Sequence, residues 1–178
     1  TATVLESGME ALSRENQGNE AKRALRAALP DWPARDLRHE VARHYPPYWQ
    51  GLPTEAHVVF ARLLDGIAPD EIRMDLTPDE DRDATRVCFA LADHPGLFSR
   101  MAGALALVGA NVVDARSYTT KDGYATAIFW IQDGDGSPYE AERLPRLREM
   151  IHKTLAGEVV ATDALERRDR LKKREQDF

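Results

Sequence analysis

The sequence predicts an α+β fold in which an antiparallel sheet carries two helices on one face, preceded by a region made of helices alone. Three observations lead to this prediction. Apolar residues recur at helical spacing up to about residue 66, they alternate with polar residues from about residue 70 onward, and the second region reads as strand, helix, strand, strand, helix. A chain of 178 residues has room for one small domain and an additional segment.

Two of the helices predicted in the first 66 residues follow from composition and spacing. The segment 20–29 is rich in Ala, Arg and Leu, which favour helices, and it ends at Pro30. The segment before it contains Gly18, so we expect it to be frayed. Over residues 54–64 apolar residues fall on one helical face, and Gly66 follows where a helix end is expected.

A further helix is predicted between these two. Asp31 offers a capping carboxylate and Pro33 suits a first helical position. The apolar face of this helix is predicted to carry Leu37, Val41 and Tyr45. The segment HYPPYWQGLP contains three prolines and is expected to interrupt helical structure.

The change to alternating residues predicts strands. The segments 71–76 and 85–93 flank the acidic turn TPDEDRDA, so they are expected to form an antiparallel pair. In the second segment Val87, Phe89 and Leu91 share one face, and the opposite face carries Arg86, Cys88 and Ala90.

The remaining elements complete the order strand, helix, strand, strand, helix. A small-residue helix is predicted over residues 97–108, a strand over 111–120, a return strand over 124–131 and a helix over 139–155. Asp122 and Gly123 predict a hairpin with a type I′ turn. This order is that of a ferredoxin-like domain. The sequence leaves two alternatives for the last strand of this domain. Either Val159 and Val160 form a short strand, or the strand near Glu71 fills that edge of the sheet.

These elements predict three parts along the chain. Residues 1–66 form the helical region, 67–157 the sheet domain with its extra first strand, and 158–178 a linker in which basic and acidic residues alternate.

Composition excludes several classes of protein. The net charge of −6 gives no overall basic footprint for nucleic acid, although the charged tail 165–178 leaves a local contact as a minor alternative, and no apolar run approaches the length of a membrane span. The first residues lack the pattern of a signal peptide, so a cytoplasmic protein is expected. The single cysteine, Cys88, cannot form a disulfide within the chain and fits a small apolar residue in a strand.

The stretch ADHPGLFSRMAGALALVGANVVDARSYTT is the most informative part of the sequence. Its Asp-His-Pro-Gly turn, small-residue helix and Gly-Ala-Asn before the next strand resemble the ACT domain, over about residues 86–157. Together with RHYPPYW and FWIQD, it is similar to the C-terminal part of the bacterial PII-protein uridylyltransferase/uridylyl-removing enzymes. The resemblance implies the end of an HD phosphohydrolase region, the first of two ACT domains and the linker to the second.

ACT domains regulate enzymes by binding amino acids, and the resemblance implies ligand contacts at the turn and at the start of the next strand. An amino acid needs donors for its carboxylate, which the N–H groups near Gly96 and Leu97 could supply. Asp93 could pair with the ammonium group, and Asn111 offers a donor and an acceptor. The candidate ligand-binding residues are therefore Asp93, His94, Gly96, Leu97, Asn111 and Val112.

Each candidate also has a structural interpretation. Asp93 could cap the helix, Asn111 could adopt the left-handed turn conformation, and His94 could be a solvated turn residue. Asp93 stands where relatives with known effectors often have Asn, which leaves the ligand open.

No catalytic or metal-binding constellation is found. The sequence lacks a Gly-Ser turn followed by an Asp-x-Asp pair, and none of its five histidines is followed by Asp. His39, His44, His57 and His152 are isolated and are expected to have structural or solvated roles. We therefore expect no cofactor in this chain, Mg²⁺ only in the missing catalytic domains of the parent, and neither transfer of uridylyl to PII nor its removal by the chain alone.

The favoured function is a regulatory module that senses an amino acid, with glutamine implied by the resemblance, in an enzyme of nitrogen metabolism whose substrate is the PII signal protein. The alternative is an ACT-like module that only pairs domains. A ferredoxin-like RNA binder or an acylphosphatase-like enzyme is disfavoured, because neither the aromatic RNA-binding pattern nor a phosphate-gripping Arg is present. A homodimer, or pairing with a second ACT domain in the parent, is expected.

Overall fold

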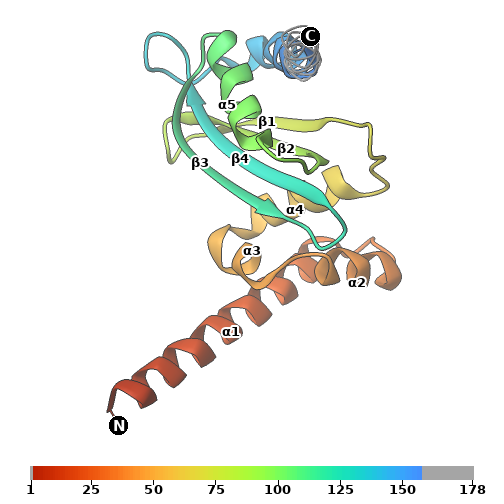
Figure 1. The fold of residues 1–178 in the computed structure, drawn as a ribbon, viewed down its shortest axis with the longest axis vertical. Coiled ribbons are helices and arrows are strands. Elements are labelled where there is room, and N and C mark those ends of the chain that lie inside the picture. The colour runs from red at the N-terminus through yellow and green to blue at the C-terminus, as the bar shows by residue number, and fades with distance from the viewer. Residues whose placement is uncertain (1, 158–178) are drawn as a thin grey trace, which may run out of the picture. The chain divides into compact units, whose positions relative to one another are not determined.

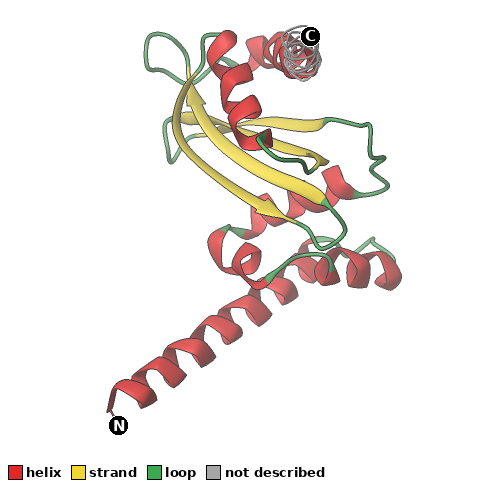
Figure 2. Cartoon of the chain, in the orientation of Figure 1, coloured by secondary structure: helices red, strands yellow, loops and turns green. Residues whose placement is uncertain are grey.

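The computed structural model describes residues 2–157. In chain order its elements are α1 (Ala2–Ala28), α2 (Ala34–Ala42), α3 (Pro46–Gly51), α4 (Thr54–Leu64), β1 (Arg73–Asp79), β2 (Ala84–Ala92), α5 (Leu97–Leu107), β3 (Asn111–Thr119), β4 (Tyr124–Gln132) and the short 3₁₀ helix η1 (Ala141–Arg143). A last helix covers residues 144–157. Figure 1 shows these elements, and Figure 2 distinguishes helices, strands and loops.

The four strands form one antiparallel sheet in the order β1-β2-β4-β3. This confirms the α+β, ferredoxin-like prediction with a helical region before the sheet. The extra strand predicted near Glu71 starts at Arg73 and occupies the edge beside β2. The other proposed edge strand, with Val159 and Val160, lies outside the described residues, as does the predicted linker 158–178.

The predicted hairpin joins β3 and β4, but its turn is not of type I′. That turn needs a positive φ at Asp122, and Asp83 is the only non-glycine residue with positive φ among those described. The Gly123 N–H donates to the carbonyl of Thr120 at 3.2 Å, and Gly123 itself has φ of 90°. The pattern is that of a turn over Lys121 and Asp122 followed by a left-handed glycine.

The two central strands are buried on both faces. In β2, Cys88 and Ala90 on one face are as inaccessible as Val87 and Phe89 on the other. The residues of β4 from Ala125 to Ile131 are likewise buried. Both faces of these strands are therefore covered, and their mostly apolar sequence is typical of strands covered on both sides.

The chain divides into two compact units, and each contains part of the sheet. The first comprises residues 1–75, 88–93 and 116–127. In it α1 packs against α3 and α4. Its core includes an aromatic cluster in which the rings of His44 and Tyr48 stack at 3.7 Å and those of Tyr48 and Trp49 meet edge to face.

Three helices of this unit differ from prediction in part. The first is continuous from Ala2 to Ala28, so Gly18 lies inside a helix and not in a frayed segment. The second helix ends at Ala42, before the proline-rich segment, as predicted. The short helix α3 within that segment was not predicted, and it can begin at Pro46 and Pro47 because a first helical turn needs no N–H from them. Asp31 makes no capping bond to α2, whose N-cap position is Pro33.

The second unit comprises residues 76–87, 94–115 and 128–178, of which 158–178 are not described. In α5 the residues Leu97, Met101, Ala104 and Leu105 are buried, and Phe98 stacks on Phe129 of β4. The predicted helix 139–155 begins instead with the 3₁₀ turn η1 and continues as an α-helix over 144–157. The sequence predicts that Leu144, Leu147, Ile151 and Leu155 face inward; the last three are buried, whereas Leu144 is only partly buried.

Candidate functional site

The turn between β2 and α5 has the geometry of a site open to a small ligand. Gly96 is the N-cap residue of α5 and has φ of 80°, a conformation that favours glycine. A side chain at this position would meet nothing within 4 Å, so the space before the helix is open. The helix is eleven residues long, and its N-terminal N–H groups favour a negatively charged ligand.

The neighbours of Gly96 are already partly engaged. The Leu97 N–H donates to the His94 carbonyl at 3.2 Å, and the Leu97 side chain is buried in the core. Asp93 is exposed, and its N–H donates to the Gly123 carbonyl at 2.9 Å. No capping bond from a side chain to α5 is present, so the role of Asp93 as a helix cap is not observed.

Arg100 is a residue of this turn that sequence reasoning missed. Its guanidinium donates to His94 Nδ1 at 2.8 Å, so His94 is a partly buried partner of Arg100 in this structure. Arg100 lies four residues after Gly96, the spacing that places two residues on one side of a helix. That spacing could have indicated Arg100 from the sequence alone. It brings the Arg100 cation to the helix end where a carboxylate is expected to bind.

Asn111 and Val112 begin β3 and are both exposed. The Asn111 side-chain amide donates to the Asp133 carbonyl at 3.0 Å. Its Oδ1 atom receives no hydrogen bond from the part of the chain that the structure describes, so this oxygen could accept one from a ligand ammonium group.

The two groups of predicted residues are not brought together within one chain. Gly96 and Leu97 lie at the start of α5, whereas Asn111 and Val112 follow its end at Leu107. At about 1.5 Å per residue the helix separates them by roughly 16 Å. A site that uses both groups therefore has to combine the turn of one domain with the strand of another.

The second unit also contains a cavity of about 480 Å³ beyond the end of α5. It is lined by Asp133, whose carbonyl holds Asn111, and by charged and apolar side chains that include Arg143, Arg146 and Leu147. The Arg143 and Asp133 side chains lie 4.0 Å apart.

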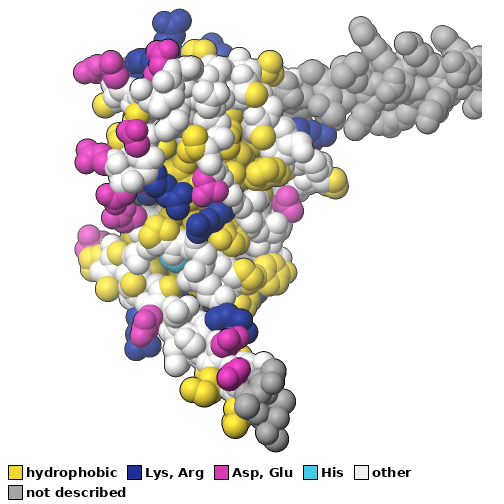
Figure 3. Space-filling view, turned by 90° about the vertical axis from the view of Figure 1, so that its left-hand side faces the viewer, with side chains coloured by type: hydrophobic (Ala, Val, Ile, Leu, Met, Phe, Trp, Pro, Cys, Tyr) yellow, Lys and Arg dark blue, Asp and Glu magenta, His cyan; other side chains and the backbone are white. Residues whose placement is uncertain are grey.

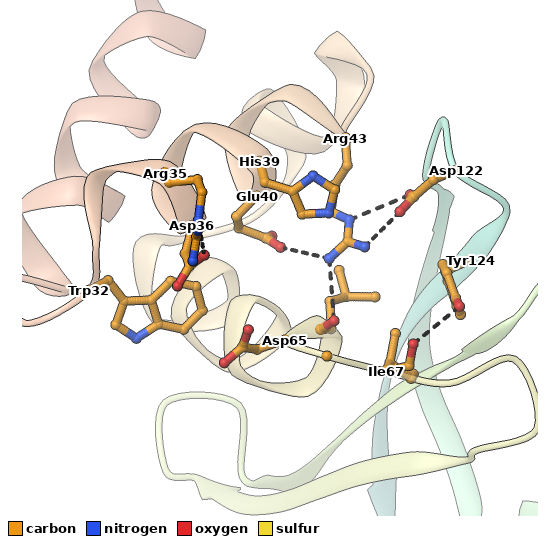
Figure 4. A pocket seen from close by; sticks show the side chains of 12 residues that line it. Trp32, Arg35, Asp36, His39, Glu40, Arg43, Asp65, Ile67, Asp122 and Tyr124 are labelled. Carbon is orange, nitrogen blue, oxygen red and sulfur yellow. Dashed lines mark hydrogen bonds and ion pairs between the residues drawn. The ribbon is translucent and has the colours of Figure 1, made fainter.

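In the first unit, a cavity of about 460 Å³ is bordered by a buried ion-pair network (Figure 4). Arg43, only 8% exposed, donates to Asp122 at 2.6 Å, to Glu40 at 3.3 Å and to the Leu64 carbonyl at 3.3 Å. The other Glu40 oxygen lies 2.6 Å from His44 Nε2. These contacts join α2, the end of α4 and the β3–β4 turn.

This network corrects the predicted apolar face of α2. The buried side chains are Glu40 in α2 and Arg43 and His44 just after it, while Tyr45 is 50% exposed. Burial works to lower the pKa of Arg43, but hydrogen bonds and attraction from Asp122 and Glu40 outweigh it and raise that pKa above its ordinary value. The guanidinium is therefore charged, and its partners make its burial tolerable.

Within residues 2–157, no group of three or more His, Cys, Asp or Glu side chains could hold a metal ion. The same residues contain no helix that is long and apolar enough to cross a membrane.

Comparison with known proteins identifies the class of this domain. Residues 86–143 match the family of ACT domains, which agrees with the sheet, with α5 and with the turn at Gly96. Over these residues the chain is thus similar to ACT domains.

Curated relatives extend the similarity to the whole chain. It is 68% identical over 182 residues to the bifunctional uridylyltransferase/uridylyl-removing enzyme of Ruegeria pomeroyi, covering 100% of this chain and 20% of that protein. It is 70% identical over 178 residues to the enzyme of the same description from Cereibacter sphaeroides, covering 100% of this chain and 19% of the relative. With the Rhodospirillum rubrum enzyme the identity is 37% over 167 residues, or 92% of this chain and 18% of the relative. The chain spans about a fifth of the length of the curated relatives it matches.

Proposed function

We propose that this chain is the regulatory, amino-acid-sensing part of a cytoplasmic bifunctional uridylyltransferase/uridylyl-removing enzyme, with glutamine as its effector. The ACT family match and the similarity along the whole chain support this proposal. In this proposal the enzyme modifies the PII signal protein and so controls nitrogen metabolism. Catalysis, and any Mg²⁺ that it needs, belong to parts of the enzyme outside this chain.

The observation that carries the proposal is the open, left-handed Gly96 at the N-terminus of α5, with Arg100 one helical turn further on. This arrangement suits a carboxylate, which would accept hydrogen bonds from the helix N–H groups and from the guanidinium. The ammonium group and side-chain amide of glutamine would then need an acceptor and a polar partner, which the exposed Asn111 and Asp93 can provide.

Because the two groups lie at opposite ends of α5, we propose that the complete site forms between two ACT domains. The edge strand β3 supports this arrangement, since its apolar residues Val112 and Val113 are 41% and 52% exposed. Figure 3 views the side of the molecule on which β3 lies in Figure 1 and shows hydrophobic side chains gathered on it. In the isolated chain the second domain would come from another copy.

A second candidate function is a module that pairs domains without binding a ligand. The hydrogen bonds of the Leu97 N–H to His94 and of Asn111 to Asp133 favour it, because they already use groups that a ligand would need.

A thermal-shift titration with each of the common amino acids separates the two functions. The sensing module is expected to gain stability with glutamine, because a ligand that binds only the folded state stabilises it. No shift with any amino acid, in a sample shown to be dimeric, would favour the pairing module.

A further inference from the structure

The β3–β4 turn is attached to the helices of the first unit by more than the Arg43 network. The Lys121 N–H donates to the Arg43 carbonyl at 2.8 Å, and His44 forms an antiparallel bridge with Thr120. The backbone after α2 therefore pairs with the end of β3 in the manner of a short additional strand.

Further contacts follow the two strands away from the turn. The Tyr124 hydroxyl donates to the Ile67 carbonyl at 3.2 Å, just beyond α4. On β3, Arg116 donates to the Gly51 carbonyl at the end of α3, and the Tyr118 ring meets the Tyr48 ring edge to face. The hairpin residues 116–127 accordingly belong to the same compact unit as α1 to α4.

Arg43 differs from these other contacts because its charge is buried and shared among three segments. Figure 4 shows it between Glu40 on its own helix, the end of α4 and Asp122 in the turn. If the turn moved away alone, it would leave a buried guanidinium without its closest carboxylate, which is costly. Movement of the turn is therefore expected to carry α2 and α4 with it.

We propose that the β3–β4 hairpin is the element through which an event in the ACT domain reaches the helices before it, and that Arg43 is the positioning residue for this coupling. The regulatory meaning of the coupling rests on the proposed function. The coupling itself is a property of the chain without ligand.

Native-state hydrogen exchange tests the coupling without any ligand. The Lys121 N–H donates to the Arg43 carbonyl, and the Asp65 N–H donates to the Ala61 carbonyl at the end of α4. In the wild-type chain these two hydrogen bonds are expected to open together. Arg43→Met should separate them, with exchange at Lys121 about tenfold or more faster and exchange at Asp65 changed much less. Arg35→Met is the matched control, because Arg35 lines the same cavity but its side chain is 86% exposed.

Asp122→Asn is the second variant, because it keeps the shape of the turn while removing the charge. It should likewise speed exchange at the Lys121 amide more than at the Asp65 amide. This variant keeps the test available if Arg43→Met fails to fold. Separate opening of Lys121 and Asp65 in the wild-type chain would overturn the proposal, as would an effect of Asp122→Asn no larger than that of Arg35→Met.

Glutamine then tests the transmission. In the wild-type chain, saturating glutamine should change exchange in α2 and α4, and Arg43→Met should bind glutamine within about twofold of wild-type affinity while losing that change. A change that persists in the variant contradicts the role of Arg43. Absence of glutamine binding would count against the proposed sensing function, while the ligand-free measurement still decides the coupling.

Discussion

The ion pair between Arg43 and Asp122 connects the acid stability of the fold to one carboxyl group. Burial works to raise the pKa of Asp122, but hydrogen bonds from Arg43 and Thr120 outweigh it and lower the pKa from 3.8 to about 2. Because the pKa is lower in the folded state, the stabilisation is complete above the unfolded pKa and is lost as the pH falls from about 4 towards 2. The Asp122 side chain is 37% exposed, so we expect only about 1 kcal/mol after solvent screening.

Denaturant unfolding of the wild-type chain and Asp122→Asn checks this expectation. The wild-type chain should be more stable by about 1 kcal/mol at about pH 5, and the difference should shrink at about pH 2.5. A difference that stays constant over this range would show that the ion pair does not stabilise the fold.

Gly96 and Asn111 are the residues at which ligand binding can be tested with the least disturbance of the fold. Asn tolerates a left-handed conformation, so Gly96→Asn should fold while its side chain occupies the open space before α5. We expect it, and Asn111→Ala, to weaken glutamine binding about tenfold to a hundredfold by calorimetry. Gly66→Asn is the matched control, because Gly66 also has positive φ and open space. If all three variants bind glutamine with the same affinity, the turn at Gly96 has only a structural role.

At the scale of elements, the contact between α3 and β3 leaves no room for a side chain at Gly51. A Cβ atom there would collide with the Tyr118 hydroxyl. Gly51→Ala is therefore expected to destabilise the fold by about 1–3 kcal/mol, and Tyr118→Phe should restore much of that loss.

Urea unfolding of the two single variants and the double variant measures this effect. Gly8→Ala serves as the control, because Gly8 lies in α1 with nothing within 4 Å and should gain stability from the better helix former. If Tyr118→Phe gives no recovery, the hairpin is not packed against α3 as described.

The spacing of apolar residues predicted the buried face of a helix where apolar side chains form that face. It failed where charged side chains are buried. The helix α4 has the predicted span 54–64, and Ala56, Phe60 and Leu64 on its predicted apolar face are buried. At the end of α2 the buried residues Glu40 and Arg43 are charged, and Asp122, the partner of Arg43, lies 79 residues away from it in sequence. Spacing within a helix cannot reveal such a distant partner.

The candidate site was predictable only in part for a similar reason. The turn chemistry indicated Gly96 as a site residue, and the structure gives it a left-handed conformation, which was suggested for Asn111 but is not found there. The partnership of Arg100 with His94 depends on where the side chains lie, and the separation of Gly96 from Asn111 depends on the path of α5.

At the scale of the whole molecule, two ACT domains are required if the turn and β3 are to form one site. We expect the chain to be in equilibrium between monomer and dimer, and we expect glutamine to shift this equilibrium towards the dimer, because a ligand held by both copies stabilises their association. Sedimentation velocity over a range of concentrations, with and without glutamine, measures that shift. A dimer population unaffected by saturating glutamine would argue against a shared site.

Calorimetric titration of the dimeric chain with glutamine tests most directly whether the chain is an amino-acid sensor. The proposed function predicts a saturable heat that Gly96→Asn and Asn111→Ala reduce and that Gly66→Asn leaves unchanged. No heat with glutamine, or a heat that none of the three variants alters, would contradict it.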